Sequence, residues 1–260
     1  MFMEDKQILV SRGIELYHFN TIDSTNKEAR RYAAGGGQAP ALFLADAQTE
    51  GRGRLGRSFF SPRETGIYMT LLLEMTDCMA SFAGLTSAVA VAVTDVMDSH
   101  LGVCAQIKWV NDVYLYGKKV CGILAESFTY DDRHFVAVGV GINLATEDFP
   151  TELKGIAGSL GVSSDRQSRM ELAALIGARI WDVFADMRRT DRSFIERYRR
   201  RSMVIGEEIS FTENGAVREG RAVAIDDDGG LMVETCDGES VTLCSGEITV
   251  RVKSDLNRRK

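Results

Sequence analysis

The sequence has few residues of the kinds that bind metals or form disulfides. It holds five cysteines and three histidines in 260 residues. No two cysteines form a Cys-x-x-Cys pair, and their odd number does not suggest a disulfide framework. His18, His100 and His134 are far apart and lack the spacing of metal ligands. The sequence therefore predicts no zinc site and no other metal site made by the protein alone, and it fits a reducing cytoplasm.

The chain also lacks a long apolar run. Residues 1–10 include Glu4, Asp5 and Lys6, so this segment has no apolar core of the kind that signal peptides have. No later segment reaches the roughly 20 apolar residues that a membrane-spanning helix needs. We therefore expect no membrane partner.

Positive charge is not in excess. The sequence has 31 Lys and Arg against 37 Asp and Glu, which gives a formal net charge of −6. This balance argues against non-specific nucleic-acid binding as the main function. A hydrophobic content of 45% with 26% charged residues is ordinary for a globular protein, and the length suffices for one large domain and a small one.

Against this acidic background, three arginines alternate with glycines in the segment Gly51-Arg52-Gly53-Arg54-Leu55-Gly56-Arg57. Glycine lets a backbone approach a ligand closely, and arginine presents planar donors that fit carboxylate and phosphate oxygens. We call residues 51–61 the arginine–glycine loop and expect it to close over an anionic small molecule. A solvated basic loop or an RNA-binding segment explains this stretch equally well when it is taken alone.

The apolar patterns indicate a mixture of helices and strands before residue 202. Helices are predicted over 27–34 and 81–101, and one continuous helical stretch over 170–201. Strands are predicted over 41–47, 66–75, 107–110 and 135–144, with a hairpin formed by 113–116 and 120–127.

After residue 202 the pattern changes to short alternating segments at 208–211, 221–225, 231–235 and 240–243. Turn signals separate them at Asn214-Gly215, Asp228-Gly229-Gly230 and Asp237-Gly238. This pattern predicts a small β-barrel. We therefore expect a larger domain at 1–203, a β-domain at 204–253 and a polar tail at 254–260.

Three further motifs carry polar residues or glycines, at 108–112, 118–126 and 139–143. The residues of the first motif have simple structural explanations: a salt bridge between Lys108 and Asp112, a core position for Trp109, and a turn at Asn111. The Gly139-Val140-Gly141 spacing is too short for a dinucleotide-binding fingerprint. Gly122 within a strand pattern indicates a close backbone approach.

Taken in order, five stretches resemble the biotin–protein ligase family. They are Asp23-Ser24-Thr25-Asn26, residues 51–57, Lys108-Trp109-Val110-Asn111-Asp112, residues 119–126 and Gly139-Val140-Gly141-Ile142-Asn143. The resemblance is strong from Tyr17 to Asn143 and weaker through the C-terminal β segments. One motif would be weak support, but five in the family's order and spacing are hard to obtain by chance.

The resemblance implies an α/β (α+β) fold, with a mixed-sheet catalytic domain related to class II tRNA synthetases and a C-terminal SH3-like β-barrel. It implies that biotin and ATP first form biotinoyl-5'-AMP and pyrophosphate. A lysine of the biotin carboxyl carrier protein then attacks this anhydride and releases AMP. Mg²⁺ would neutralise the remaining triphosphate charge.

The resemblance also implies roles for individual residues. The biotin-binding residues are Ser24, Thr25, Gln48, Gly51, Arg52, Gly53, Arg54, Lys119 and Gly122. The nucleotide-binding residues are Arg52, Arg54, Arg57, Phe59, Asn111, Lys119 and Asn143. The catalytic residues are Lys119, Arg54 and Asp112. Arg52 and Arg54 would lie near the biotin carboxyl and the phosphate, Lys119 would bridge the two, and Asp112 would hold and help to deprotonate the carrier lysine.

Two positions depart from the family's pattern. Phe59 stands where the family often has tryptophan, so it keeps an aromatic face but loses an N–H donor. Val110 replaces the usual proline, and no reacting group is lost. Only about twenty residues precede Asp23, too few for the DNA-binding module of some family members, so we expect none. Both a monomer and a homodimer remain open.

Two other functions compete with this one. A lipoate–protein ligase or octanoyltransferase on a related fold would bind a long acyl chain instead of a ureido ring. An RNA-binding protein would use the arginine–glycine loop without catalysis, although the net charge argues against it.

Overall fold

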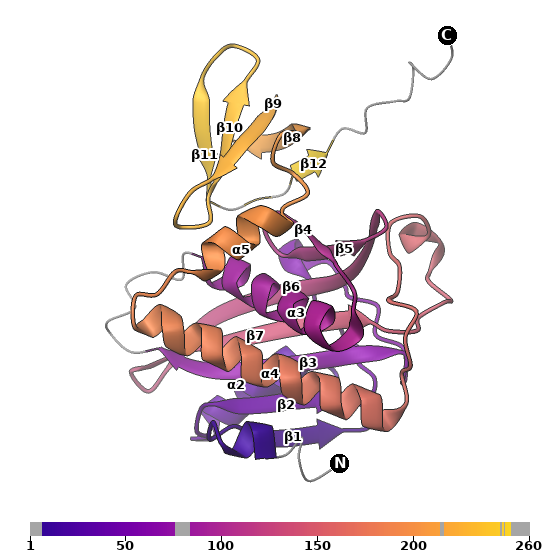
Figure 1. Cartoon of the computed structure of the whole chain (residues 1–260). Coiled ribbons are helices and arrows are strands. Elements are labelled where there is room, and N and C mark those ends of the chain that lie inside the picture. The colour runs from indigo at the N-terminus through magenta and orange to yellow at the C-terminus, as the bar shows by residue number, and fades with distance from the viewer. Residues whose placement is uncertain (1–6, 76–83, 214–215, 245, 247, 251–260) are drawn as a thin grey trace.

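Two β-sheets organise the computed structural model of this chain (Figure 1). The structure describes residues 7–75, 84–213, 216–244, 246 and 248–250. The predicted helix start at 81–83, the turn at 214–215 and the polar tail at 254–260 lie outside these residues. The predicted domain boundary between residues 203 and 204 remains a prediction.

The larger sheet has seven strands in the order β1-β2-β3-β7-β6-β5-β4. They are β1 (Glu15–Phe19), β2 (Ala41–Ala45), β3 (Gly66–Met75), β4 (Gln106–Lys108), β5 (Asp112–Leu115), β6 (Lys118–Tyr130) and β7 (Arg133–Asn143). β1 is parallel to β2, whereas all other neighbours are antiparallel. The predicted mixed sheet is confirmed. β1 was not predicted, since its residues at the sheet edge are mostly half-buried and show little alternation.

Helices cover the two faces of this sheet unequally. Successive side chains of a strand point to opposite faces. Leu71 and Val138 point to the face covered by α3 (Leu85–Leu101), α4 (Arg166–Arg188) and α5 (Phe194–Arg201), which Figure 1 shows in front of the sheet. Phe43, Leu72 and Ala137 point to the other face, where α2 (Thr25–Ala34) packs. α2 contacts mainly β2, β3 and β7. The part of this sheet face nearer β5 is therefore not covered by α2, and a cavity lies there.

The prediction of one helical stretch over 170–201 is wrong. α4 ends at Arg188 and α5 begins at Phe194. Thr190 between them has a left-handed backbone (φ 65°), and the Asp191 carboxylate accepts the Ser193 N–H at 2.7 Å. This local hydrogen bond competes with helix continuation. The apolar periodicity resumes at Phe194 and Ile195, which are buried, and therefore concealed the break.

The smaller sheet confirms the predicted C-terminal β-domain. Its strands are β8 (Glu208–Glu213), β9 (Ala216–Ile225), β10 (Leu231–Thr235), β11 (Ser240–Leu243) and β12 (Ile248–Val250). They form an antiparallel sheet in the order β11-β10-β9-β8-β12, in which only β12 was not predicted. The β9–β10 turn contacts the larger domain, because the buried Trp109 indole donates to the Gly229 carbonyl at 2.9 Å. Within the described ranges, no helix has the length and apolarity to cross a bilayer.

A buried ion pair joins α4 to the end of β2. Arg169 Nη2 donates to Asp46 Oδ1 at 2.8 Å, and His18 Nε2 lies 3.1 Å from the same oxygen. Burial alone raises the pKa of Asp46, but the hydrogen bonds from Arg169 and His18 outweigh it and lower the pKa below its usual value. The stabilisation is therefore present above the ordinary carboxyl pKa and is lost as the pH falls through the lower folded value.

Asp46→Asn is expected to lower the free energy of unfolding by about 3–5 kcal/mol at neutral pH, because it leaves the Arg169 charge buried without its partner. Urea unfolding followed by circular dichroism measures this. The control is Asp182→Asn, which breaks the more exposed pair with Arg12 and is expected to cost about 1 kcal/mol or less. Equal unfolding midpoints for the two variants would contradict the expectation.

Candidate active site

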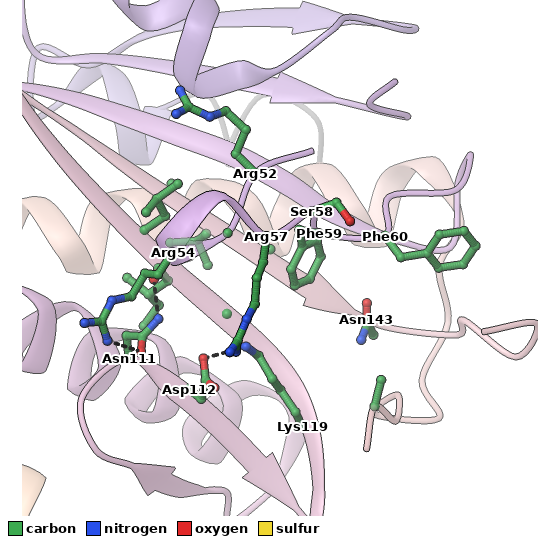
Figure 2. Close-up of a pocket in the computed structure, with 18 of the residues that line it drawn as sticks. Arg52, Arg54, Arg57, Ser58, Phe59, Phe60, Asn111, Asp112, Lys119 and Asn143 are labelled. Atoms are coloured by element: carbon green, nitrogen blue, oxygen red, sulfur yellow. Dashed lines mark hydrogen bonds and ion pairs between the residues drawn. The ribbon is translucent and has the colours of Figure 1, made fainter. Parts of the chain in front are cut away.

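A cavity of about 540 Å³ opens on the α2 face of the larger sheet (Figure 2). This volume lies in the range of small-molecule sites. Its walls are the start of α2, the arginine–glycine loop and residues 149–157, and its floor is formed by β6 and β7. The structure brings together every predicted site residue except Gly51. The predicted residues that line the cavity are Ser24, Thr25, Gln48, Arg52, Gly53, Arg54, Arg57, Phe59, Asn111, Asp112, Lys119, Gly122 and Asn143.

Glycines create the floor of the cavity. Gly139 and Gly141 lie on the same face of β7. A Cβ at residue 139 would lie 2.3 Å from Asn26 Oδ1, and one at residue 141 would lie 2.6 Å from the Phe59 ring. Gly122, opposite Gly141 on β6, leaves room for the same ring at 3.3 Å. The Gly-x-Gly pattern therefore places two side-chain-free positions under the site.

One end of the cavity is polar and uncharged. Ser24 precedes α2, but its hydroxyl makes no capping hydrogen bond to the helix, so it is available to a ligand. The Thr25 N–H donates to Gln48 Oε1 at 2.8 Å, and Gln48 Nε2 donates to Ser61 Oγ at 3.1 Å. Gln48 thus ties the start of α2 to the end of the arginine–glycine loop. Its direct contact with biotin remains a prediction.

The arginine–glycine loop is closed at its base by its own backbone. The Phe59 N–H donates to the Gly51 carbonyl at 2.9 Å, and the Gly53 N–H donates to the Arg57 carbonyl at 2.7 Å. A Cβ at residue 51 would lie 2.3 Å from the Phe59 carbonyl oxygen, so this position needs glycine for packing. Gly51 is not among the cavity-lining residues, so in this structure it serves the packing of the loop.

The loop distributes its three arginines between two places. Arg54 Nη1 donates to Asn111 Oδ1 at 3.0 Å, and Asn111 Nδ2 donates to the Ile123 carbonyl at 2.8 Å. Lys119 Nζ lies 2.6 Å from Asp112 Oδ1, and Figure 2 shows Arg57 pointing to the same region. We call Arg54, Arg57 and Lys119 the cationic cluster.

Arg52 points away from the cationic cluster (Figure 2). Its Nη2 lies 3.2 Å from Glu126 Oε1 on β6. The turn at Arg54–Gly56, in which Leu55 has a φ of 53°, redirects the chain between Arg52 and Arg57. The resemblance implies that Arg52 and Arg54 both lie near the biotin carboxyl and the phosphate, which stays a prediction; in this structure Arg52 contacts Glu126 and Arg54 contacts Asn111.

Sequence reasoning missed the segment 149–157. Phe149, Leu153, Ile156 and Ala157 line the cavity next to Asn143. Their position follows from pairing with Lys119, whose N–H donates to the Ile156 carbonyl at 2.9 Å. This pairing joins residues far apart in the chain, so no local pattern reveals it.

The Asn143 side chain leaves one acceptor unused beside this segment. Its Nδ2 donates to the Gly158 carbonyl at 3.0 Å, while its buried Oδ1 has no hydrogen-bond partner among the described residues. A ligand donor, such as an exocyclic amine, would satisfy this oxygen.

Cys121 is excluded as a nucleophile. It is completely buried on the opposite face of β6, and burial raises the pKa of its thiol far above the usual value, which outweighs the nearby Lys119 charge. Burial also raises the pKa of Tyr114, and the Asp112 charge adds to this, so Tyr114 remains neutral in the cavity wall. The arrangement is therefore suited to charge stabilisation rather than to covalent catalysis by the enzyme.

The comparisons with known proteins agree with this chemistry. The sequence model of the Biotin/lipoate A/B protein ligase family matches residues 19–143, and that of the Biotin protein ligase C terminal domain matches residues 204–251. A biotin--[acetyl-CoA-carboxylase] ligase of Paracoccus denitrificans is 34% identical over 84% of this chain and 94% of its own length. The chain belongs to the biotin protein ligase family. It is an enzyme of the biotin–[acetyl-CoA-carboxylase] ligase type, as predicted.

Other members of the family support the same assignment. The bifunctional ligase/repressor BirA of Bacillus spizizenii is 34% identical over 87% of this chain and 71% of its own length. Among solved structures, the biotin protein ligase from Aquifex aeolicus in complex with biotin and ATP matches with a TM-score of 0.78 and 27% identity. The match covers 91% of this chain and 98% of that one. The predicted synthetase-like catalytic fold with a small C-terminal β-domain is thereby confirmed.

Proposed function

We propose that the enzyme activates biotin with ATP to form biotinoyl-5'-AMP and transfers the biotinoyl group to a specific lysine of a biotin carboxyl carrier protein. The observation that supports this most directly is one cavity with a polar, uncharged end and a cationic end. The first end suits a ureido ring, which has two donors and one acceptor. The second end suits a carboxylate meeting a phosphate.

The first step requires the carboxylate of biotin to attack the α-phosphorus of ATP. Two unit negative charges at ~4 Å repel by about 4 kcal/mol at an effective dielectric near 20. Lys119, Arg54 and Arg57 offset this repulsion, most strongly as negative charge develops on the α-phosphate in the transition state. The C–O–P anhydride forms, and pyrophosphate leaves with the electrons of the broken P–O bond.

Biotin would lie with its ureido ring towards Ser24 and Thr25. Its apolar thiophane ring and valeryl chain would cross the glycine floor at Gly122 and Gly141, beside the Phe59 ring. This places its carboxylate at Lys119. The adenosine would occupy the side with Asn143, whose free Oδ1 accepts a hydrogen bond.

The oxygen ligands that the cavity offers fit a magnesium ion that arrives with ATP. Among the described residues, no three His, Cys, Asp or Glu side chains come together as a metal site. Of the described residues that line the cavity, Asp112 is the only one with a carboxylate, and Asn111 is next to it. Mg²⁺ usually takes one or two protein oxygens and completes its shell with phosphates and water. Asp112 and Asn111 would hold it, and it would neutralise triphosphate charge.

The second step needs a neutral amine. The carrier lysine approaches as an ammonium ion, and the Asp112 carboxylate attracts it and accepts a proton. The amine then attacks the biotinoyl carbonyl, an amide forms, and AMP leaves. For this to happen Asp112 must exchange its partner Lys119 for the incoming lysine.

Biotin-dependent exchange of labelled pyrophosphate into ATP tests the first step directly. Exchange with biotin but not with lipoate or octanoate is expected, because the two acids lack a ureido group for Ser24 and Thr25. Exchange with lipoate alone would favour the rival acyl ligase. Tight, salt-sensitive RNA binding without any exchange would instead favour the RNA-binding function.

We also propose a cytoplasmic enzyme whose macromolecular partner is the carrier protein, without a nucleic-acid or membrane partner. The cysteine pattern and the negative net charge support this. Its state is a monomer or a homodimer, which sedimentation of the purified enzyme distinguishes.

The arginine–glycine loop is expected to become protected when ligands bind. Biotinoyl-AMP is lost if water reaches it, and a loop that folds over the intermediate excludes water. Limited trypsin digestion should cut after Arg52, Arg54 or Arg57, and biotin plus ATP should slow this cleavage about tenfold or more. Cleavage at Arg188 and Arg189, at the exposed C-terminal end of α4, serves as the internal control. Equal cleavage of the arginine–glycine loop with and without ligands would contradict this prediction.

A further inference from the structure

Glu126 connects the arginine–glycine loop with α2. It lies on β6, and its side chain is 18% exposed. Arg52 Nη2 lies 3.2 Å from Oε1, and Asn26 Nδ2 donates to Oε2 at 2.9 Å. One carboxylate therefore contacts two of the walls of the cavity, although Glu126 itself is not among its lining residues.

Glu126 is the closer of two acceptors that orient the Asn26 amide, since Asn26 Nδ2 also donates to the Leu124 carbonyl at 3.5 Å. An ionised carboxylate only accepts hydrogen bonds, so the NH₂ group of Asn26 must face it. The Asn26 Oδ1 then faces the Thr70 hydroxyl at 2.6 Å. Asn26 is buried, and Gly139 leaves the space that Oδ1 occupies, since a Cβ there would lie at 2.3 Å. The amide is thus held on three sides.

Thr70 connects the Asn26 amide to Thr25 by hydrogen bonds. Thr70 has a single hydroxyl hydrogen, and Asn26 Oδ1 can only accept it. The Thr70 hydroxyl also faces the Thr25 oxygen as a donor, at 2.8 Å. The Thr25 hydroxyl itself donates to Gln48 Oε1 at 3.1 Å, and the second lone pair of that oxygen accepts the Thr25 N–H. With its hydrogen directed at Gln48, the Thr25 oxygen has one lone pair towards Thr70 and one left for a ligand.

We propose that Glu126 is a positioning residue for biotin. Through Asn26 and Thr70 it fixes the position of the Thr25 oxygen, which accepts a ureido N–H, and through Arg52 it keeps one arginine paired and away from the cationic cluster. The inference rests on the proposed function, because it names the part of biotin that Thr25 receives. Glu126 does not touch the reacting atoms.

Glu126→Gln tests the proposal, since it keeps the size of the side chain and removes the charge. An amide can turn either its donors or its oxygen towards Asn26, so the direction of the hydrogen bonds is no longer fixed. In the pyrophosphate exchange reaction we expect the KM for biotin to rise about tenfold, while kcat and the KM for ATP change by about twofold or less. The matched control is Glu74→Gln, which removes the carboxylate of the Glu74–Arg133 pair on β3, outside the cavity, and should leave the KM for biotin unchanged.

A reciprocal exchange provides a rescue. Asn26→Asp alone would place two carboxylates against each other and is expected to raise the KM for biotin. When it is combined with Glu126→Gln, the introduced carboxylate would accept hydrogen bonds from both the glutamine amide and Thr70. The contact between positions 26 and 126 is then kept with its direction reversed, and the direction of the Thr70 hydrogen bond is restored. The double variant should therefore bring the KM for biotin back to within about threefold of the unaltered enzyme.

Gly139→Ala gives a test that leaves Glu126 intact. Its methyl group displaces Asn26 Oδ1, so the KM for biotin should again rise with little change in the KM for ATP. An unchanged KM for biotin in Glu126→Gln, an equal loss in all kinetic constants, or no recovery in the double variant would overturn the inference. Absence of biotin-dependent exchange in the unaltered enzyme would instead refute the proposed function.

Discussion

Replacement of Lys119 by alanine is expected to lower kcat/KM for biotin-dependent pyrophosphate exchange by about 10²–10³-fold, as loss of one charge-stabilising donor does in other enzymes. Lys119 lines the cavity, and its ammonium group lies 2.6 Å from Asp112 Oδ1 in the region to which Arg57 points. It is the cation best placed to contact both the carboxylate and the α-phosphate. Initial rates at varied biotin and ATP concentrations measure the loss.

Lys118→Ala is the matched control. Lys118 is the preceding residue, does not line the cavity, and donates from Nζ to the Gly155 carbonyl. Its exchange activity should remain within about threefold of the unaltered enzyme. Comparable losses in the two variants would mean that this hairpin tolerates no change, and the specific role of Lys119 in the first step would be refuted.

Asp112→Asn is expected to lower the transfer of biotin to the carrier protein by about 10²–10⁴-fold, the usual contribution of a general base. Pyrophosphate exchange should also fall, but less, because the asparagine oxygen still contacts Lys119 while the negative charge that orients it is lost. Quenched-flow measurements with preformed biotinoyl-AMP isolate the transfer step.

The comparison of the two steps within the same variant is its own control. If exchange and transfer fall by the same factor, Asp112 only positions Lys119, and its role as a base in the second step is wrong. A normal pH dependence of the residual transfer would have the same meaning, because the loss of a base should shift the reaction towards higher pH, where the carrier lysine is already neutral.

Much of the cavity could be predicted from short segments. Ser24, Arg54, Lys119 and Asn143 occur in motifs in which residue type and local spacing already limit the chemistry. Residues that alternate along a strand share a face whatever the sheet order, so Gly139 and Gly141 had to lie together. The resemblance to a known family then supplied the order of these motifs.

Glu126 shows where local reasoning ends. It belongs to a recognised motif, yet nothing in that motif says that it pairs with Arg52 and Asn26, which precede it by 74 and 100 residues. The segment 149–157 is similar, because it reaches the cavity only by pairing with Lys119. The single helix predicted over 170–201 failed for the opposite reason, since one local hydrogen bond at Asp191 interrupts an apolar periodicity that continues beyond it.

The sequence by itself determined the mixed α/β fold, the C-terminal β-domain and an acid-activating chemistry based on arginine and lysine, because periodicity and residue type are local properties. Only the tertiary structure decided which cations share Asp112 and Asn111 and which one pairs with Glu126. Those partners come from β5, β6, α2 and the arginine–glycine loop, and the order in which strands pair sets the distances between them. Electrostatic interactions weaken with distance, so the function of each charge depends on contacts that no short stretch of sequence contains.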